Sequence, residues 1–166
     1  MVALFAVATF VGLALETTIP RLLPMGALVP DLVLILVVDL GFRHHGALAP
    51  AMAFAMGYAV DSFSGTHLGL NAFMYTLIFL LAYEMSRHLM ATGTFIGVTT
   101  VFLGVILKGY GDFAISSAWN VSGQMGTLLA PVLLQAMITA LLAPWVFVLM
   151  ARGKRTLGLP QRSLRE

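Results

Sequence analysis

The chain has 166 residues, of which 60% are hydrophobic and only 10% are charged. Soluble globular domains carry about 25% charged residues, so this composition excludes a water-soluble enzyme, a nucleic-acid-binding domain and a disordered chain. The length accommodates six apolar spans of about 20 residues each, together with short connections. The absence of cysteine excludes disulfides, zinc–thiolate sites and thiol catalysis. The composition therefore predicts an all-α integral membrane protein.

Six apolar stretches predict six transmembrane helices. The first contains one acidic residue, Glu16, and lacks the basic start and cleavage site of a signal peptide, so a retained helix ending at Pro20 is expected. Pro30 favours the first helical position of the second helix, and Pro144 is expected to kink the sixth. The predicted spans are Met1–Ile19, Pro30–Phe42, Ala47–Ser62, Leu70–Met85, Phe95–Ile115 and Leu128–Ala151.

The basic residues predict how the helices are oriented. Arg43 and Arg87 follow the second and fourth helices, and five further Lys and Arg residues follow Ala151, whereas the other connections contain only Arg21. Because cytoplasmic segments carry the excess of Lys and Arg, both termini are expected in the cytoplasm, which an even number of spans allows. Two regions follow: a six-helix transmembrane domain, residues 1–151, and a basic cytoplasmic tail, residues 152–166, lying along the membrane surface or unfolded.

Alanine and glycine form rows at helical spacing, and such rows let helices approach closely in a membrane. The third helix has two adjacent rows, so it is expected at the centre of the bundle, packed on two sides. Shorter rows on the first and fifth helices can pack internally or face a partner helix, and the first is the preferred docking surface. The rows are Ala47, Ala51, Ala55 and Ala59; Ala49, Ala53 and Gly57; Ala8 and Gly12; and Gly97, Gly104 and Gly111.

Charged groups inside a membrane are expected to be paired, because an unpaired charge there costs several kcal/mol. Three pairs are spaced to interact along one helix. The first two are predicted to be structural anchors, and the third is either a structural clasp or part of a polar cavity. The pairs are Asp39 with Arg43, Glu84 with Arg87 or His88, and Lys108 with Asp112.

Two further acids are expected on the outer side of the membrane. Asp31 lies at the start of the second helix, where the helix dipole favours a carboxylate, and Asp61 lies at the end of the third, where the dipole opposes it. Asp61 therefore needs other donors, and the loop to Asn71 can supply backbone N–H groups near Gly65 and Gly69. Asp61 is predicted to pin this loop, or alternatively to line a solute pocket. No sequence motif for catalysis, phosphate binding or metal binding is present.

The segment from residue 30 to residue 71 carries a family resemblance. Its order of features resembles that of the MreD family of bacterial rod shape-determining membrane proteins, and the chain length, the number of spans and the basic tail are compatible with that family. The residues that carry the resemblance are Pro30, Asp31, Arg43, Gly57, Asp61, Gly65, Gly69 and Asn71.

The resemblance implies a non-enzymatic, multi-pass scaffold in the bacterial inner membrane, without cofactor, metal or catalytic residues. Such a scaffold belongs to the cell-elongation (rod) complex and supports peptidoglycan synthesis and cell shape. The implied partners are an MreC-like bitopic protein, RodA with its partner transpeptidase, MreB and membrane lipid, but no nucleic acid. The small-residue row of Ala8 and Gly12 on the first helix is the surface on which we expect the MreC-like partner to dock.

The resemblance also implies a fold similar to the S component of energy-coupling-factor transporters. The alternative function is therefore a substrate-binding S component of a vitamin transporter. Its pocket would open outward, and the polar residues expected there are Asp61, Trp119, Asn120 and Gln124.

Overall fold

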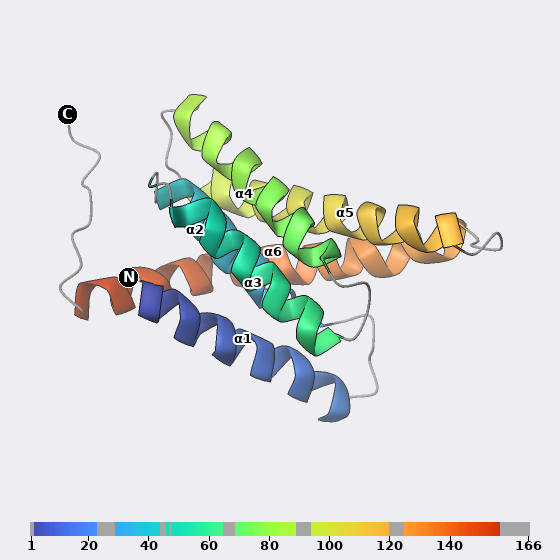
Figure 1. The fold of residues 1–166 in the computed structure, drawn as a ribbon, viewed down its shortest axis with the longest axis horizontal. Helices are drawn as coiled ribbons and strands as arrows, with labels where there is room; N and C mark the ends of the chain where they lie inside the picture. The colour runs from blue at the N-terminus through green and yellow to red at the C-terminus, as the bar shows by residue number, and fades with distance from the viewer. Residues whose placement is uncertain are drawn as a thin grey trace.

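The computed structural model describes residues 2–22, 29–43, 46, 48–64, 69–88, 94–119 and 125–156, with the backbone alone for 19–22, 88, 115–119, 125–129 and 156. The described residues form six α-helices (Figure 1), which confirms the all-α class. The helices are α1, Val2–Leu22; α2, Leu32–Arg43; α3, Leu48–Ser64; α4, Leu70–His88; α5, Thr94–Trp119; and α6, Met125–Thr156.

The helix ends differ from the predicted ends in two informative ways. α1 continues through Pro20 to Leu22, because a proline in the last turn removes only one intrahelical hydrogen bond. α2 begins at Leu32 and not at Pro30. Asp31 precedes the helix as its N-cap, with Oδ1 accepting from the backbone N–H of Leu34 at 2.8 Å. Aspartate is among the preferred residues at that position, so Pro30 lies outside the helix.

α2 is the central helix of the bundle, and the prediction that the third helix would be central is wrong. α2 packs against each of the other five helices, and its residues 33–41 are all buried. A helix that is apolar on every side is suited to that position. Its 12 residues extend over only about 18 Å, but neighbouring helices enclose it and its ends contact protein.

α3 packs mainly against α4, and the row of small residues that contains Gly57 is buried. Gly57 allows the closest approach, because a Cβ added there would lie 2.5 Å from the carbonyl oxygen of Asn71. Ala51 and Ala55 of the second row are exposed. The buried row comprises Ala49, Ala53, Gly57 and Asp61.

The small residues of α1 and α5 lie against other helices of the same chain. A Cβ added at Gly12 would lie 3.6 Å from Leu32 and Val33 of α2, and Ala8 packs against the hydrophobic core. The three glycines of the α5 stripe each meet a neighbouring side chain: Gly97 meets Phe147, Gly104 meets Ile78 and Leu34, and Gly111 meets Met74.

The beginning of α1 and the end of α6 lie at the same end of the bundle (Figure 1). The Nζ of Lys154 lies 5.0 Å from the ring centroid of Phe5. α6 extends to Thr156 and Lys154 is buried, so the helix continues past the predicted boundary at Ala151. The remaining tail residues, 157–166, lie outside the described part of the chain.

Large apolar side chains cover much of the outer surface, including Phe10, Phe95, Leu141 and Trp145. Within the described residues, Thr94–Ala114 and Ala130–Arg155 are long and apolar enough to cross a membrane, and Val2–Thr18 is a shorter apolar helix. The crossing of the membrane by all six helices stays a prediction.

Candidate functional site: a buried polar network beside a cavity

Asp61, at the end of α3, binds the beginning of α4 with both carboxylate oxygens. Oδ2 accepts from the backbone N–H groups of Gly69 and Ala72 at 3.0 and 3.1 Å. Oδ1 accepts from the backbone N–H and from the Nδ2 of Asn71 at 3.1 and 2.9 Å. Gly69 has a φ of +96°, a conformation that glycine adopts without strain. Asp61, with no exposed surface, therefore caps α4 from a different helix, which is the structural role that the sequence suggested.

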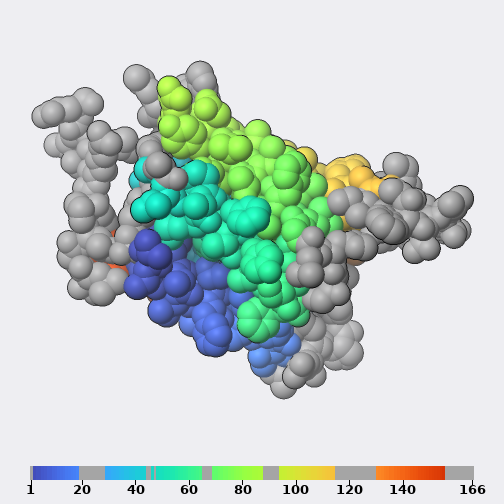
Figure 2. Space-filling model, viewed as in Figure 1, coloured from blue at the N-terminus to red at the C-terminus, as the bar shows by residue number. Residues whose placement is uncertain are grey.

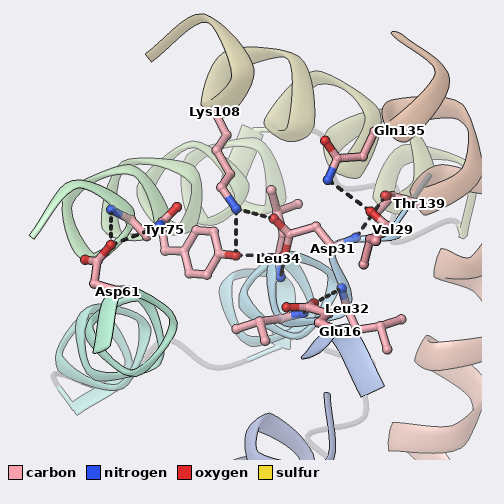
Figure 3. A network of polar contacts seen from close by, with 12 residues as sticks. Glu16, Val29, Asp31, Leu32, Leu34, Asp61, Tyr75, Lys108, Gln135 and Thr139 are labelled. Atoms are coloured by element: carbon pink, nitrogen blue, oxygen red, sulfur yellow. Dashed lines mark hydrogen bonds and ion pairs between the residues drawn. The ribbon is translucent and has the colours of Figure 1, made fainter. Parts of the chain in front are cut away.

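Asp31, at the beginning of α2, is the centre of a second network (Figure 3). Its Oδ1 accepts from the hydroxyl of Tyr75 at 2.7 Å, in addition to the Leu34 N–H. Its Oδ2 lies 2.6 Å from the Nζ of Lys108, which also donates to the Tyr75 hydroxyl at 3.2 Å. The backbone N–H of Asp31 donates to Thr139 at 3.1 Å. One carboxylate thereby connects α2 with α4 and α5, and its backbone connects α2 with α6.

Lys108 has an ion-pair partner, Asp31, that its local sequence did not suggest, and its predicted pairing with Asp112 stays a prediction. The predicted pair has the lysine N-terminal to the acid, which is the weaker orientation for neighbours on one helix. Asp31 offers Lys108 a buried carboxylate from another helix. Both Lys108 and Asp112 line a cavity, and whether the two also form a clasp with each other stays a prediction.

Glu16 and Gln135 complete the attachment of α2 to its neighbours. The Oε1 of Glu16 accepts from the backbone N–H groups of Leu32 and Val33 at 2.5 and 3.1 Å, which are otherwise unpaired donors of the first helical turn. The Nε2 of Gln135 donates to the carbonyl oxygen of Val29 at 3.0 Å. The beginning of α2 is therefore bound by side chains from α1 and α6.

A cavity of about 510 Å³ opens beside this network and is lined by residues of α1, α3, α4, α5 and α6 and of the segment before α2. Its wall is partly apolar and partly charged. The apolar residues are Leu13, Val29, Pro30, Val60, Phe63 and Leu70, and the polar residues are Glu16, Thr17, Asp31, Ser64, Asn71, Lys108, Asp112 and Gln135.

A separate cluster of charges lies at the other end of α2. Asp39 is buried, and its two oxygens lie 2.6 Å from the Nε of Arg43 and 2.7 Å from the Nζ of Lys154. The predicted contact between Asp39 and Arg43 is confirmed, whereas Lys154 was not expected there. Glu84 and Arg87 are 3.9 Å apart and more than half exposed, so that pair contributes little.

The structure brings most of the predicted residues to one end of the bundle. Pro30, Asp31 and Asn71 line the cavity, while Gly57 and Gly69 pack or bind around Asp61 and Asn71. Arg43 lies at the opposite end with Asp39. Gly65 lies outside the described residues, as do the side chains of Trp119, Asn120 and Gln124.

Sequence reasoning missed the roles of Glu16, Tyr75, Thr139 and Gln135 in this network. Glu16 and Gln135 carry a signal in the sequence, because each is an isolated polar residue in an otherwise apolar helix and such residues face the interior of a bundle. Tyr75 carries no such signal in the sequence, since tyrosine occurs both in packed cores and at membrane surfaces.

Comparison with known proteins supplies the family. No curated protein and no solved structure matches the chain, so the predicted similarity to the S-component fold stays a prediction. The family model described as rod shape-determining protein MreD matches residues 1–152, which include all of α1 to α5 and most of α6. The chain therefore belongs to the MreD family, membrane proteins of the bacterial inner membrane with a role in determining rod cell shape.

Proposed function

We propose that the chain is a non-enzymatic scaffold of the cell-elongation complex that binds the transmembrane helix of an MreC-like bitopic partner. The observation that carries this proposal is the match of residues 1–152 to the MreD family model. Through that partner the scaffold would connect RodA, its partner transpeptidase and MreB, and so support peptidoglycan synthesis.

The buried charges of the described residues are consistent with a scaffold. Asp31 pairs with Lys108, Asp39 with Lys154, and Asp61 binds the beginning of α4. Removing either partner of a buried ion pair is strongly destabilising, so each interaction holds one arrangement of the helices. A rigid bundle presents a fixed surface to a partner helix without an ordering cost at binding.

The docking surface that we propose is the exposed stripe of α3. Ala51, Phe54, Ala55 and Tyr58 follow one another at helical spacing and are all exposed. Figure 2 shows α3 uncovered between α1 and α4. Without a hydrophobic driving force in lipid, a partner helix gains contact where small side chains let the two backbones approach. Ala51 and Ala55 provide that approach, and the rings of Phe54 and Tyr58 provide contact area beside it.

This surface replaces the docking site expected on α1. Gly12 is buried against α2 and Ala8 packs on the core, so replacing them with a residue as large as leucine would disturb the bundle itself. The exposed side of α1 carries Val7, Phe10 and Val11 beside the exposed Ala3, Ala6 and Ala14, and the large apolar residues there suit contact with lipid.

Co-purification tests the docking surface. The double variant Ala51→Leu/Ala55→Leu should reduce the amount of MreC-like partner recovered with the scaffold by about tenfold, because two leucines hold a partner backbone away. Ala130→Leu is the matched control, since Ala130 is also an exposed helical alanine. Full recovery of the partner by the α3 variant, with a melting temperature equal to that of the parent, would contradict this assignment.

We also propose six membrane crossings with both termini in the cytoplasm. The common position of the beginning of α1 and the end of α6 supports an even number of crossings, and the positions of Arg43 and Arg87 give the orientation. Reporter fusions provide the test: alkaline phosphatase should be active when fused at residue 66, and a fluorescent protein should mature when fused at the C-terminus. The reverse pattern would overturn the orientation.

A further inference from the structure

A groove lies on the outer surface of α6, near the end of that helix. It measures about 510 Å³, and the residues that line it all belong to α6. Because residues three, four and seven positions apart lie on one side of a helix, Trp145, Val148 and Arg152 form a continuous face. We call this feature the α6 groove, and its lining residues are Pro144, Trp145, Val146, Val148, Leu149 and Arg152.

The apolar part of the α6 groove is uncovered in the bundle. Trp145 is 78% exposed, and Leu149 and Val148 are 69% and 51% exposed. The helix that carries them is long and apolar enough to cross a membrane. Large apolar side chains suit contact with acyl chains, whereas a partner helix needs small ones for close approach of the two backbones. Lipid is therefore the occupant that fits this part of the groove.

Arg152 places a positive charge at one end of the groove. It is exposed and lies seven residues beyond Trp145, or about 10 Å along the helix axis. It has no carboxylate partner within the described part of the chain, whereas the exposed Arg87 lies 3.9 Å from Glu84. The guanidinium group of Arg152 is therefore available to an anion, and its planar set of donors matches the oxygens of a phosphate group.

The surroundings of Arg152 favour an anionic headgroup over a zwitterionic one. Both kinds of phospholipid carry a phosphate group, but a zwitterionic headgroup adds a cationic group beside it. Arg155, one turn further along α6, is also exposed, and two neighbouring positive charges repel that cationic group. An anionic headgroup has no such group and is attracted by both arginines.

A second copy of this chain fits the α6 groove less well than a lipid does. Two copies inserted in the same direction and related by a two-fold axis through this face would contact each other with the same residues. Their Arg152 side chains would then lie together, and like charges repel. A lipid headgroup instead supplies the opposite charge.

We infer that the α6 groove binds one anionic phospholipid, whose phosphate group accepts hydrogen bonds from Arg152 and whose acyl chain packs along Leu149 and Trp145. The geometry suits a phospholipid, because the charged end of a crossing helix lies at the level of the headgroups and the acyl chains extend inward from there. The site goes beyond the scaffold function, and it rests only on the proposal that α6 crosses the membrane.

Fluorescence quenching by brominated phospholipids tests the site, because bromine atoms on an acyl chain quench a tryptophan that they contact. The chain contains two tryptophans, Trp119 and Trp145, so Trp119→Phe leaves the groove tryptophan as the only reporter. In vesicles that mix phosphatidylglycerol with phosphatidylcholine, either lipid can carry the bromine. The ratio of the two quenching efficiencies gives the preference of the groove for the anionic lipid.

In the Trp119→Phe background, phosphatidylglycerol should be preferred by about fivefold, which is the gain that one basic residue provides near an anionic headgroup. Arg152→Gln should lower the preference to less than about twofold, and Arg152→Lys should retain most of it because the charge is kept. Arg87→Gln is the matched control, since it removes the same charge from an exposed arginine of α4 outside the groove. This control should keep the preference of the parent.

Three results would overturn the inference while leaving α6 in the membrane: equal quenching by the two brominated lipids, a preference that survives Arg152→Gln, or an equal loss in Arg87→Gln. The last result would mean that the charge of the whole surface, and not the groove, attracts the lipid. Absence of quenching by either lipid would contradict both the site and the crossing of the membrane by α6.

Native mass spectrometry gives a second measurement, in which Trp119 is kept. At one concentration of phosphatidylglycerol in detergent, the parent chain should retain one lipid molecule more than Arg152→Gln does, and equal retention would contradict the site. Recovery of the MreC-like partner is measured separately and depends on α3, whereas the groove belongs to α6 alone. Docking of the partner and binding of the lipid can therefore fail independently.

Discussion

Asp61 shows how a carboxylate can occupy a helix end that its charge opposes. It belongs to the last turn of α3, but the groups that it binds are the N–H groups at the beginning of α4, where the dipole is positive and favours an anion. The unfavourable field of its own helix is thereby offset by the favourable field of the next helix.

Replacing Asp61 should destabilise the bundle in proportion to the acceptors that are lost. Asp61→Ala leaves the N–H groups of Gly69, Asn71 and Ala72 without their partner and should lower the free energy of unfolding by about 1–3 kcal/mol. Asp61→Asn retains one acceptor oxygen and should be intermediate. Thermal unfolding in detergent measures both, with Glu84→Ala as an exposed control. An unchanged melting temperature for Asp61→Ala would show that Asp61 does not hold α4.

The effects on stability of replacing Lys108 and of replacing Asp31 should be coupled. Lys108→Met leaves the Asp31 carboxylate buried without its cation and should cost about 3–5 kcal/mol. Asp31→Asn should also destabilise, since it leaves the ammonium group without its anion. The double variant should lose much less than the sum of the two single variants. Strict additivity in this double-mutant cycle would mean that the 2.6 Å contact contributes no coupling.

Interactions within one stretch of sequence could be predicted, and those between distant stretches could not. The pair of Asp39 with Arg43 follows from a spacing of four residues. The partner of Lys108 lies 77 residues away and the partner of Lys154 lies 115 residues away. Local spacing therefore suggested Asp112 for Lys108 and the membrane surface for Lys154, because nothing near either lysine in the sequence marks the distant carboxylate.

The six helices could be predicted from hydropathy, whereas the residues at which the helices end could be predicted less well. α4 starts at the predicted residue, Leu70, and continues past the predicted end to His88. α6 likewise continues to Thr156. Helices leave the apolar region with charged residues in their last turn, so the apolar pattern stops before the helix does.

The glycines distinguish close contacts between helices from ordinary ones, so substitutions at Gly57 and at Gly12 should differ in their effect on the stability of the bundle. Gly57→Ala places a Cβ 2.5 Å from the Asn71 carbonyl oxygen and should force α3 from α4, at a cost of about 1–3 kcal/mol. Gly12→Ala places its Cβ at an ordinary distance of 3.6 Å from Leu32 and Val33. It should be neutral or stabilising by up to about 1 kcal/mol, because alanine favours helix. Equal melting temperatures for the two variants would contradict the packing of α3 on α4.

For the whole molecule, composition predicted a helical membrane bundle, but not which faces are inside. Ala53 and Ala55 are chemically identical and two positions apart, yet the first is buried and the second is exposed. Small residues indicate close approach of two helices without telling whether the second helix belongs to the same chain. The central position of α2 had a signal in its uninterrupted apolar sequence, which is typical of an enclosed helix.

Ala51 and Ala55 lie exposed one helical turn apart on α3, and this supports our assignment of the exposed stripe of α3 to a partner. A helix facing only lipid has no need of small side chains, because large apolar ones cover the backbone equally well in contact with acyl chains. The exposed surface of α6 follows that pattern, with Met137, Leu141 and Trp145.

Site-directed crosslinking tests the central claim most directly, since the chain contains no cysteine. Ala55→Cys, paired with single cysteines along the transmembrane helix of the MreC-like partner, should form a disulfide at positions spaced by about one helical turn. Leu141→Cys, on the exposed side of α6, should form none. Crosslinks from Leu141→Cys in the absence of crosslinks from Ala55→Cys would contradict docking on α3.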